Sequence, residues 1–286
     1  MAKVGIIPNP DKPDALRVTA ELADWLEAHD VAPLLAEQNA ALAGRPALGR
    51  TVDDLVREVD FAIVLGGDGT LLSAAKLLAP AGKPILGVNL GHLGFLTEIE
   101  LPDLYQALPA VLADRYLVEE RIMLEARVIR DNQETRRFLA LNEVVATKGS
   151  FARLIQLETY VGDRLVATYP ADGLIVATPT GSTAYSLSAG GPIVNPNVGV
   201  IIVTPICPHT LYARAIIVSQ DEAVRVRIIA EHQDNALTID GQRGYRIFNG
   251  DVIEVRRARE TTKLMRLEGW SFYEVLRRKL QEGGYR

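Results

Sequence analysis

Residues 61–78 combine three features that strongly restrict the fold of this chain. Residues 61–65 are a continuous apolar run, residues 66–70 read GGDGT, and the leucines and alanines of residues 71–78 recur at helical spacing. An Asp-Gly pair between apolar runs is also a common hairpin signal. Hairpin strands alternate apolar with polar residues, however, whereas these flanks do not. The stretch therefore predicts a buried strand, a glycine turn and a helix.

The first third of the chain repeats this alternation of strand-like and helix-like runs. Strand patterns occur at residues 3–9 and 84–95, and helical patterns at residues 14–29 and 101–113. Nearly continuous apolar strands separated by helices are typical of a parallel sheet covered on both faces. We therefore predict a Rossmann-like α/β domain over residues 1–115.

Beyond Tyr116 the pattern changes to many short strands. Apolar and polar residues alternate at residues 155–161 and 224–227, and further strand candidates lie at residues 123–130, 138–147, 173–178, 200–205, 236–241 and 251–257. Turn signals separate several of these runs, which favours an all-β sandwich over residues 116–269. Residues 270–286 return to a helical pattern, and we expect this helix to pack back on the first domain.

Composition narrows the classes of protein. The 286 residues carry a net charge of −5, which argues against a general nucleic-acid binder. Cys207 is the only cysteine, so an internal disulfide is impossible and a reducing compartment fits. We expect Cys207 to be a buried small hydrophobe. The sequence has neither a signal-peptide pattern nor an apolar run of membrane-spanning length, and we expect a cytoplasmic protein with no membrane partner.

The glycine turn is suited to binding phosphate. Backbone N–H groups at the start of a helix attract anions, and glycine lets a phosphate approach the main chain. The sequence has no Walker pattern, and residues 87–94 miss the dinucleotide pattern G-x-G-x-x-G because Asn89 replaces a glycine. The carboxylate of Asp68 would repel a bound phosphate unless it holds a metal ion or faces another group of the substrate. It is a candidate proton acceptor or magnesium ligand in phosphoryl transfer.

A second candidate site lies at residues 171–194, where several hydroxyl side chains surround Gly181 and Tyr185. These groups suit phosphate or ribose oxygens and one base face, although a polar loop explains the pattern equally well. Two weaker candidates have ordinary structural explanations. A pattern such as Asn142-Glu143 is more often a solvated bulge than a binding site, and one such as Asp240 with residues 241–242 is more often a plain turn. The four histidines show no paired metal-ligand spacing.

The segments at residues 66–70, 142–143, 172–194, 204–211 and 240–242 together closely resemble the NAD kinase family, in order and in spacing. The resemblance runs from residue 3 to about residue 270. It implies an N-terminal α/β domain with a C-terminal β-sandwich, and transfer of the terminal phosphoryl group of ATP or polyphosphate to the 2'-hydroxyl of the adenosine ribose of NAD. It also implies a divalent metal ion, Mg²⁺ by expectation, and a homodimer or homotetramer.

The resemblance also suggests site residues. Asp68 matches the family's proton acceptor, with Gly69 beside it in the NAD site. The other positions that match NAD contacts are Asn142, Glu143, Arg153, Asp172, Thr183, Ala184, Tyr185, Ser186, Leu187, Ser188 and Gln242. Many relatives carry a serine or a basic residue where this chain has Pro170 and Ala171, so no contact is transferred to these two.

Three other functions are compatible with parts of the pattern. A lipid kinase of the diacylglycerol type shares the GGDGT turn but needs an apolar groove or a membrane-facing patch. A non-catalytic NAD(P) sensor would bind the dinucleotide without forming NADP. An oxidoreductase is disfavoured by the incomplete dinucleotide fingerprint.

Overall fold

The computed structural model describes residues 1–91, 94–149, 154–210, 212–230 and 234–282, and it divides the chain into two compact units. Unit 1 contains Met1–Glu120 and Thr261–Arg286, and unit 2 contains Arg121–Glu260. The chain leaves unit 1 along β7 (Leu117–Arg130) and returns along β18 (Val252–Arg266). Within the described residues, no helix is long and apolar enough to cross a membrane.

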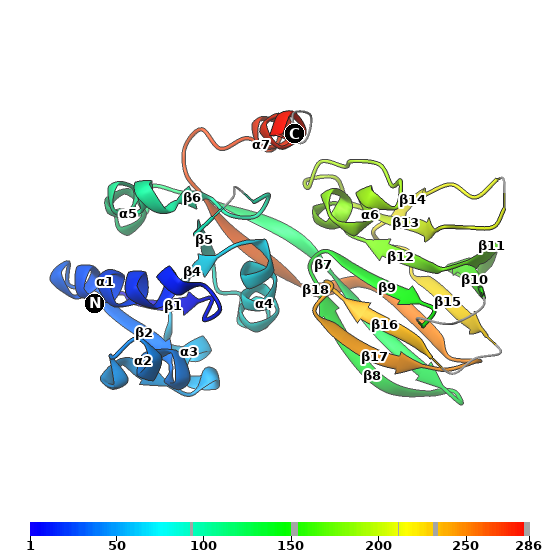
Figure 1. Cartoon of the computed structure of the whole chain (residues 1–286), viewed down its shortest axis with the longest axis horizontal. Helices are drawn as coiled ribbons and strands as arrows, with labels where there is room; N and C mark the ends of the chain where they lie inside the picture. The colour runs from blue at the N-terminus through cyan, green and yellow to red at the C-terminus, as the bar shows by residue number, and fades with distance from the viewer. Residues whose placement is uncertain (92–93, 150–153, 211, 231–233, 283–286) are drawn as a thin grey trace. The chain divides into compact units, whose positions relative to one another are not determined.

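Unit 1 is an α/β unit built on a parallel sheet (Figure 1). Its strands are β1 (Lys3–Pro8), β2 (Ala32–Ala36), β3 (Gly49–Arg50), β4 (Phe61–Gly66), β5 (Ile85–Asn89) and β6 (Ile99–Glu100). Its α-helices are α1 (Pro13–Ala28), α2 (Glu37–Leu42), α3 (Val52–Glu58), α4 (Asp68–Leu78), α5 (Leu104–Leu112) and α7 (Phe272–Glu282), and its 3-10 turns are η1 (Pro46–Leu48), η2 (Ala79–Ala81) and η3 (Leu101–Asp103).

The strand order of unit 1 is β3-β2-β1-β4-β5, with β6 and the last part of β18 also paired to β5. Side chains alternate across this sheet, so its two faces are covered by different helices. Helices α1 and α5 share one core with Ile6, Ile63 and Leu86. On the opposite face, Gly5 lies against Leu55 of α3 and Gly87 against Leu71 of α4. The predicted α/β fold is confirmed.

Unit 2 consists of two mostly antiparallel sheets. One has the order β14-β13-β12-β9-β16-β17, and the other has the order β11-β10-β15-β18-β7-β8. The additional strands are β8 (Gln133–Ala140), β9 (Glu143–Thr147), β10 (Ile155–Val161), β11 (Arg164–Ala171), β12 (Gly173–Ala177), β13 (Val200–Ile206), β14 (Ile216–Ser219), β15 (Val224–Ile229), β16 (Asn235–Ile239) and β17 (Arg243–Ile247). Inward-facing side chains of both sheets form one core, including Leu124, Val144, Leu157 and Val226. The predicted β-rich second domain is confirmed.

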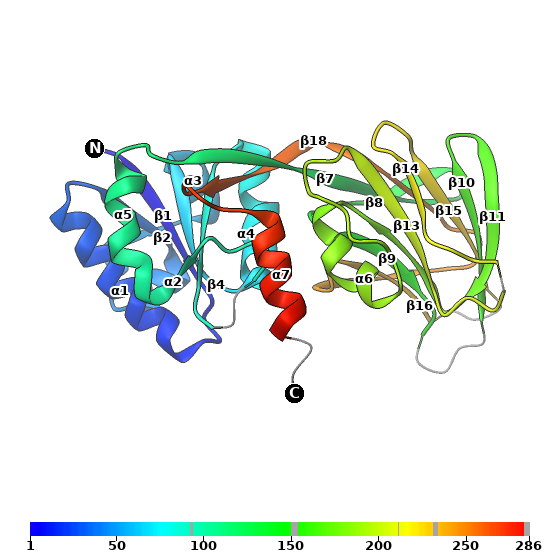
Figure 2. The ribbon, with the colours of Figure 1, turned by 90° about the horizontal axis from the view of Figure 1, so that it is seen from above.

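The turn η4 (Thr180–Thr183) and the short helix α6 (Tyr185–Ser188) follow β12, and α6 lies beside that strand (Figure 1). Figure 2 shows α6 from a second direction. A second apolar cluster, which contains Val145, Ile175 and Ile202, covers the outer face of the six-stranded sheet. Strands β9 and β12 are therefore buried on both faces, which explains their continuous apolar sequences.

Three expectations from the sequence are wrong in detail. Residues 138–147 form two strands instead of one, because the chain breaks at Leu141 and Asn142 and changes sheet. The strand expected at residues 251–257 continues to Arg266. Cys207 is exposed, because it follows β13 in a turn with a φ of 44°, where its side chain leaves the sheet.

Candidate functional site

The glycine turn of unit 1 lies at the carboxyl edge of the parallel sheet. Strand β1 continues to β2 on one side, while its other neighbour, β4, continues to β5 on the opposite side. In sheets of this kind, ligands bind outside the carboxyl ends of the strands where the order reverses, which here lies between β1 and β4. The GGDGT turn follows β4, so the predicted strand, turn and helix form at this position.

The start of α4 is shaped by close contacts that require glycine. A Cβ atom on Gly66 would lie 2.3 Å from Oγ1 of Thr70, so no larger residue fits without a shift of the helix. Around Gly67 the space is open, with no atom within 4 Å of a Cβ built there. The backbone N–H of Leu71 donates to the carbonyl oxygen of Gly67 at 3.1 Å and closes the first turn. The helix therefore directs its positive end at open space beside the turn.

Asp68 is half-buried and held in one orientation by the backbone. Its Oδ2 accepts a hydrogen bond from the N–H of Phe95 at 2.9 Å, and its Oδ1 accepts one from the N–H of Leu96 at 3.1 Å. A Cβ on Gly94 would lie 2.0 Å from Oδ1, so this approach of the carboxylate depends on glycine at position 94. The predicted catalytic carboxylate is thus fixed in position before any substrate binds.

The loop that holds Asp68 is itself held by a buried arginine. Arg266 of β18 donates from Nη1 to the carbonyl oxygen of Leu96 at 3.2 Å and forms ion pairs with Glu98 at 3.0 Å and Glu119 at 2.8 Å. Arg266 and Glu98 are both almost completely buried. Burial raises the pKa of Glu98 and outweighs the attraction of Arg266, which acts in the opposite direction.

Lys12 is a cation at this edge that sequence reasoning missed. Its Nζ lies 2.9 Å from the place that a Cβ on Gly91 would occupy. The loop that carries Lys12 follows β1 and is attached to β4, since the N–H of Asn9 donates to the carbonyl oxygen of Leu65 at 2.8 Å. The position of Lys12 in the sequence could have identified it. Lys12 follows the first strand, so it lies at the same edge of the sheet as the glycine turn.

In unit 2, Asn142 and Glu143 lie in a buried corner and not in a solvated bulge. Their side chains are 8% and 4% exposed. The N–H of Thr178 donates to the carbonyl oxygen of Asn142 at 2.9 Å, and a Cβ on Gly181 would lie 2.2 Å from the same oxygen. The side-chain Oδ1 of Asn142 is buried and accepts no hydrogen bond from the described residues. Such an acceptor is suited to a ligand that brings an N–H group.

Asp240 holds this corner in place. Its Oδ1 accepts hydrogen bonds from the N–H groups of Asn142 at 2.8 Å and Glu143 at 3.2 Å, and its Oδ2 accepts one from the N–H of Leu141 at 3.2 Å. Asp240 is 5% exposed and has a φ of 51°. The sequence suggested an ordinary turn here, but the carboxylate takes the place of a strand partner for three amides.

The residues of the predicted loop differ in their exposure. Tyr185, Leu187 and Ser188 are exposed, and Thr183 and Ala184 are half-buried. Ser186 is completely buried, and its hydroxyl contacts Oγ1 of Thr204 at 2.9 Å.

The remaining predicted contacts lie apart from this loop in the sequence. Asp172 forms an ion pair with Lys148 at 2.7 Å, and Gln242 is exposed in the turn after β16. Arg153 lies outside the described residues. Another buried residue that sequence reasoning missed is Arg121, which donates to Oγ1 of Thr180 in η4 at 3.3 Å.

A glycine turn at the switch point of a parallel sheet, beside an oriented carboxylate, is suited to an enzyme that handles nucleotides and transfers phosphoryl groups. Comparison with models of protein families identifies the family. The model of the ATP-NAD kinase N-terminal domain matches residues 4–116, and that of the ATP-NAD kinase C-terminal domain matches residues 141–267. The chain belongs to the ATP-NAD kinase family and is an NAD kinase-type phosphotransferase, as its motifs predict.

Curated relatives support this membership over the full length. The chain is 51% identical to an NAD kinase of Caldanaerobacter subterraneus subsp. tengcongensis over 282 residues, which cover 99% of this chain and 100% of that one. It is 49% identical to an NAD kinase of Moorella thermoacetica over 286 residues, which cover 100% of this chain and 91% of that one.

Solved structures are similar as well. Yeast NADH kinase complexed with NADH superposes with a TM-score of 0.91 at 26% identity, covering 100% of this chain and 89% of that chain. An NAD kinase from Archaeoglobus fulgidus in complex with ATP gives a TM-score of 0.76 at 24% identity and covers 98% of each chain, a likeness in fold. These findings favour the NAD kinase prediction over the lipid kinase alternative.

Proposed function

We propose that this enzyme transfers the terminal phosphoryl group of ATP to the 2'-hydroxyl of the adenosine ribose of NAD, with Asp68 as the proton acceptor. The observation that carries the proposal is the Asp68 carboxylate, which two backbone N–H groups orient at the start of α4. A carboxylate is a weak base, so the contribution of Asp68 depends on its orientation toward the hydroxyl. As the oxygen of the hydroxyl attacks the phosphorus, its proton passes to Asp68 and ADP leaves with the bond electrons.

The phosphate-binding part of the proposal rests on the surroundings of Asp68. The N-terminus of α4 and the Nζ of Lys12 supply positive potential for the phosphates of the donor, in place of the missing Walker lysine. Gly69, which follows Asp68 at the start of α4, is a further proposed contact of NAD. A bound magnesium ion would neutralise the donor phosphates. Enzymes commonly hold this ion with one or two carboxylates, water and the phosphates themselves, so a cage of protein ligands is not needed.

NAD recognition is assigned to unit 2. We propose that the buried Oδ1 of Asn142 accepts a hydrogen bond from the adenine amino group, with Glu143 beside it. Thr183, Ala184, Tyr185, Leu187 and Ser188 wrap the dinucleotide, and Arg153, Asp172 and Gln242 are further contacts. Ser186 holds the loop in shape, because its hydroxyl is already bonded inside the unit.

The first test is direct. Purified protein is given NAD or NADH, each with ATP or polyphosphate, and formation of the 2'-phosphorylated product is measured. Product with ATP supports the proposal, and the other three mixtures reveal the choice of donor and acceptor. Binding of NAD without product in any mixture would favour the sensor alternative.

The second test concerns the role of Asp68. Replacing Asp68 with Asn keeps an oxygen for one backbone N–H but removes the proton acceptor, so we expect the turnover number to fall by about 10²- to 10⁴-fold. NAD affinity and the thermal unfolding midpoint should change little. The exposed Asp103, changed to Asn, is the matched control. A turnover number near that of the unchanged protein would rule out the role.

We also propose that the protein acts in the cytoplasm as a homodimer or homotetramer, without nucleic-acid or membrane partners. The single cysteine suits a reducing compartment, and the net charge of −5 does not favour polyanion binding by the whole surface. Light scattering after size-exclusion chromatography tests the assembly.

A further inference from the structure

Unit 2 contains a cavity of about 410 Å³ lined with an unusual number of positive side chains. Its lining comes from β7, β8 and β18, and includes Arg127, Arg137, Arg256, Arg257 and Arg259. We call this cavity the arginine pocket. Since the whole chain carries a net charge of −5, the concentration of five guanidinium groups in one cavity needs an explanation.

Three of these arginines converge on one carboxylate. Glu125 accepts hydrogen bonds from Nε of Arg127 at 2.9 Å, Nη1 of Arg137 at 3.3 Å and Nη2 of Arg256 at 2.7 Å. The Glu125 side chain is only 15% exposed. One carboxylate neutralises one positive charge, so this cluster retains an excess of positive charge.

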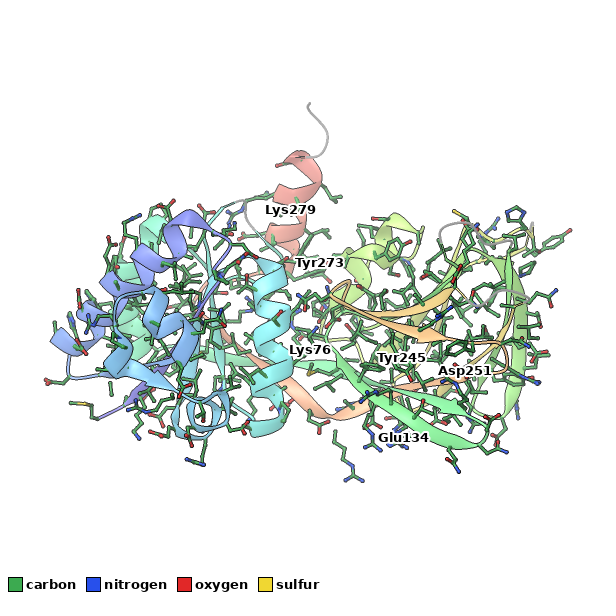
Figure 3. The ribbon with its side chains drawn as sticks, turned by 60° about the horizontal axis from the view of Figure 1, so that its bottom comes forward. Lys76, Glu134, Tyr245, Asp251, Tyr273 and Lys279 are labelled. Atoms are coloured by element: carbon green, nitrogen blue, oxygen red, sulfur yellow. The ribbon has the colours of Figure 1, made fainter. Side chains whose placement is uncertain are left out.

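The strand pairing also places like charges together. Arg127 of β7 lies directly opposite Arg137 of β8. Like charges opposite one another on neighbouring strands destabilise a sheet. Glu134, labelled on β8 in Figure 3, forms ion pairs with Arg137 at 3.0 Å and Arg127 at 3.7 Å and offsets part of this repulsion. Folding alone does not require two arginines at this pair of positions.

The other two arginines of the pocket differ from these three in their surroundings. Arg257 and Arg259 are exposed and form no ion pair within the part of the chain that the structure describes. Glu260 is the remaining acidic residue of the lining. Even with Glu125, Glu134 and Glu260 counted, the positive side chains around the pocket outnumber the negative ones by two.

We propose that the arginine pocket binds a compact anion made of several linked phosphates, of the tripolyphosphate class. Guanidinium groups form paired hydrogen bonds with phosphate oxygens, and a chain of phosphates offers one such partner to each of several arginines. Arg257 and Arg259 provide the unpaired donors, and the Glu125 cluster provides the fixed positive floor. The site lies entirely in unit 2 and does not depend on the proposed roles of Asp68 or Lys12.

Chemical protection locates this binding on individual residues. The full-length protein is treated with phenylglyoxal, which modifies arginine, and modification of each arginine is quantified by mass spectrometry with and without sodium tripolyphosphate. We expect tripolyphosphate to slow the modification of Arg257 and Arg259 by at least about tenfold, because bound phosphate shields both guanidinium groups. Arg164 and Arg227, which lie outside the pocket, should react at unchanged rates.

Separate ligand arms define the anion. Protection by tripolyphosphate alone assigns an inorganic chain, equal protection by ATP assigns the triphosphate of a nucleotide, and both results support the proposal. Equal protection by monophosphate at the same ionic strength would overturn it, because linked phosphates would then have no advantage. Unchanged reactivity of Arg257 and Arg259 in every arm would also overturn it.

A pair of variants provides an independent measurement. In the double variant Arg257→Ser and Arg259→Ser, the affinity for tripolyphosphate, measured by calorimetric titration, should fall at least about tenfold. The melting temperature should not change, because both side chains are exposed. The matched control, Arg164→Ser and Arg227→Ser, removes the same charge outside the pocket. Equal losses in the two double variants would mean that net charge alone attracts the anion, and would overturn the proposal.

Discussion

Asp240 illustrates how a single carboxylate can fix the shape of a proposed binding site through the backbone. It accepts three backbone hydrogen bonds from residues 141–143 in a buried corner. These backbone N–H groups lie where the chain passes from β8 in one sheet to β9 in the other. Asp240 therefore sets the position of Asn142, the residue proposed to recognise adenine.

Replacing Asp240 with Asn gives the first residue-scale prediction. The amide keeps one acceptor oxygen but turns an NH₂ group toward a backbone N–H, so we expect a loss of about 1–3 kcal/mol in the free energy of unfolding. The KM for NAD should rise, while kcat changes less, because Asp240 positions the binding corner and not the reacting atoms. Steady-state kinetics and thermal unfolding measure the two effects.

Asp221, an exposed aspartate of the same unit, provides the control when changed to Asn. A variant at position 240 with lowered kcat and an unchanged KM would contradict the positioning role.

At this scale the sequence pointed to some candidate residues and missed others. Asp68 was identified because glycines flank it at a strand-to-helix turn, a local pattern. Arg121, Lys12 and Asp240 were missed or undervalued because their partners are distant in the sequence, and only tertiary packing brings them together. Ser186 resembled a ligand contact, but its hydroxyl faces Thr204 inside the unit.

At the scale of elements, β18 does more than complete a sheet. Its last part pairs with β5 at Leu264 and Ile85, and it delivers Arg266 to the loop that holds Asp68. The sequence predicted only a short strand here, because the polar residues 259–263 obscured the apolar alternation that continues to Leu264. Glu98 connects this strand to the loop through an ion pair and through the N–H of Leu267 at 2.8 Å.

Glu98 gives a prediction about pH. Its pKa is raised in the folded protein by burial, so between its ordinary value of 4.5 and the raised value the folded state binds more protons than the unfolded state. The contribution of Glu98 to stability is therefore fully present below pH 4.5 and is lost as the pH rises through the folded pKa.

The variant Glu98→Gln cannot ionise and should lack this dependence. We expect the difference in unfolding free energy between the unchanged protein and the variant to decrease as the pH rises from the acidic range toward neutrality. Urea unfolding at a series of pH values measures it. Parallel stability profiles for the two proteins would refute the assignment, and Glu100→Gln at an exposed position of the neighbouring strand serves as the control.

At the scale of the molecule, the periodicities of the sequence predicted both fold classes. Continuous apolar strands and amphipathic helices indicated the α/β part, and alternating strands indicated the sandwich. The short strands β3 and β6, and the change of sheet between β8 and β9, were not predicted, because short strands carry too few residues to establish a period.

The two units differ in the number of chain segments that form them. Unit 2 is one continuous segment with its own core, whereas unit 1 is assembled from two segments. We expect residues 121–260, expressed alone, to unfold cooperatively in a thermal melt. Residues 1–120, expressed alone, should be less stable than the same unit in the whole chain, since they lack Arg266 between Glu98 and Glu119. A cooperative thermal transition for residues 121–260, together with a lowered unfolding midpoint or no transition for residues 1–120, would match this expectation.

If residues 121–260 have no cooperative transition, unit 2 does not fold independently of unit 1.

The order in which the segments of unit 1 appear has a consequence during synthesis. Residues 1–120 are synthesised before unit 2, and the last part of β18, which carries Arg266, is synthesised after it. Until that last segment emerges, the carboxylates of Glu98 and Glu119 lack their buried cation, and the loop that holds Asp68 lacks its support. A chain truncated before residue 266 therefore carries the complete GGDGT motif without the arginine that supports the loop around Asp68.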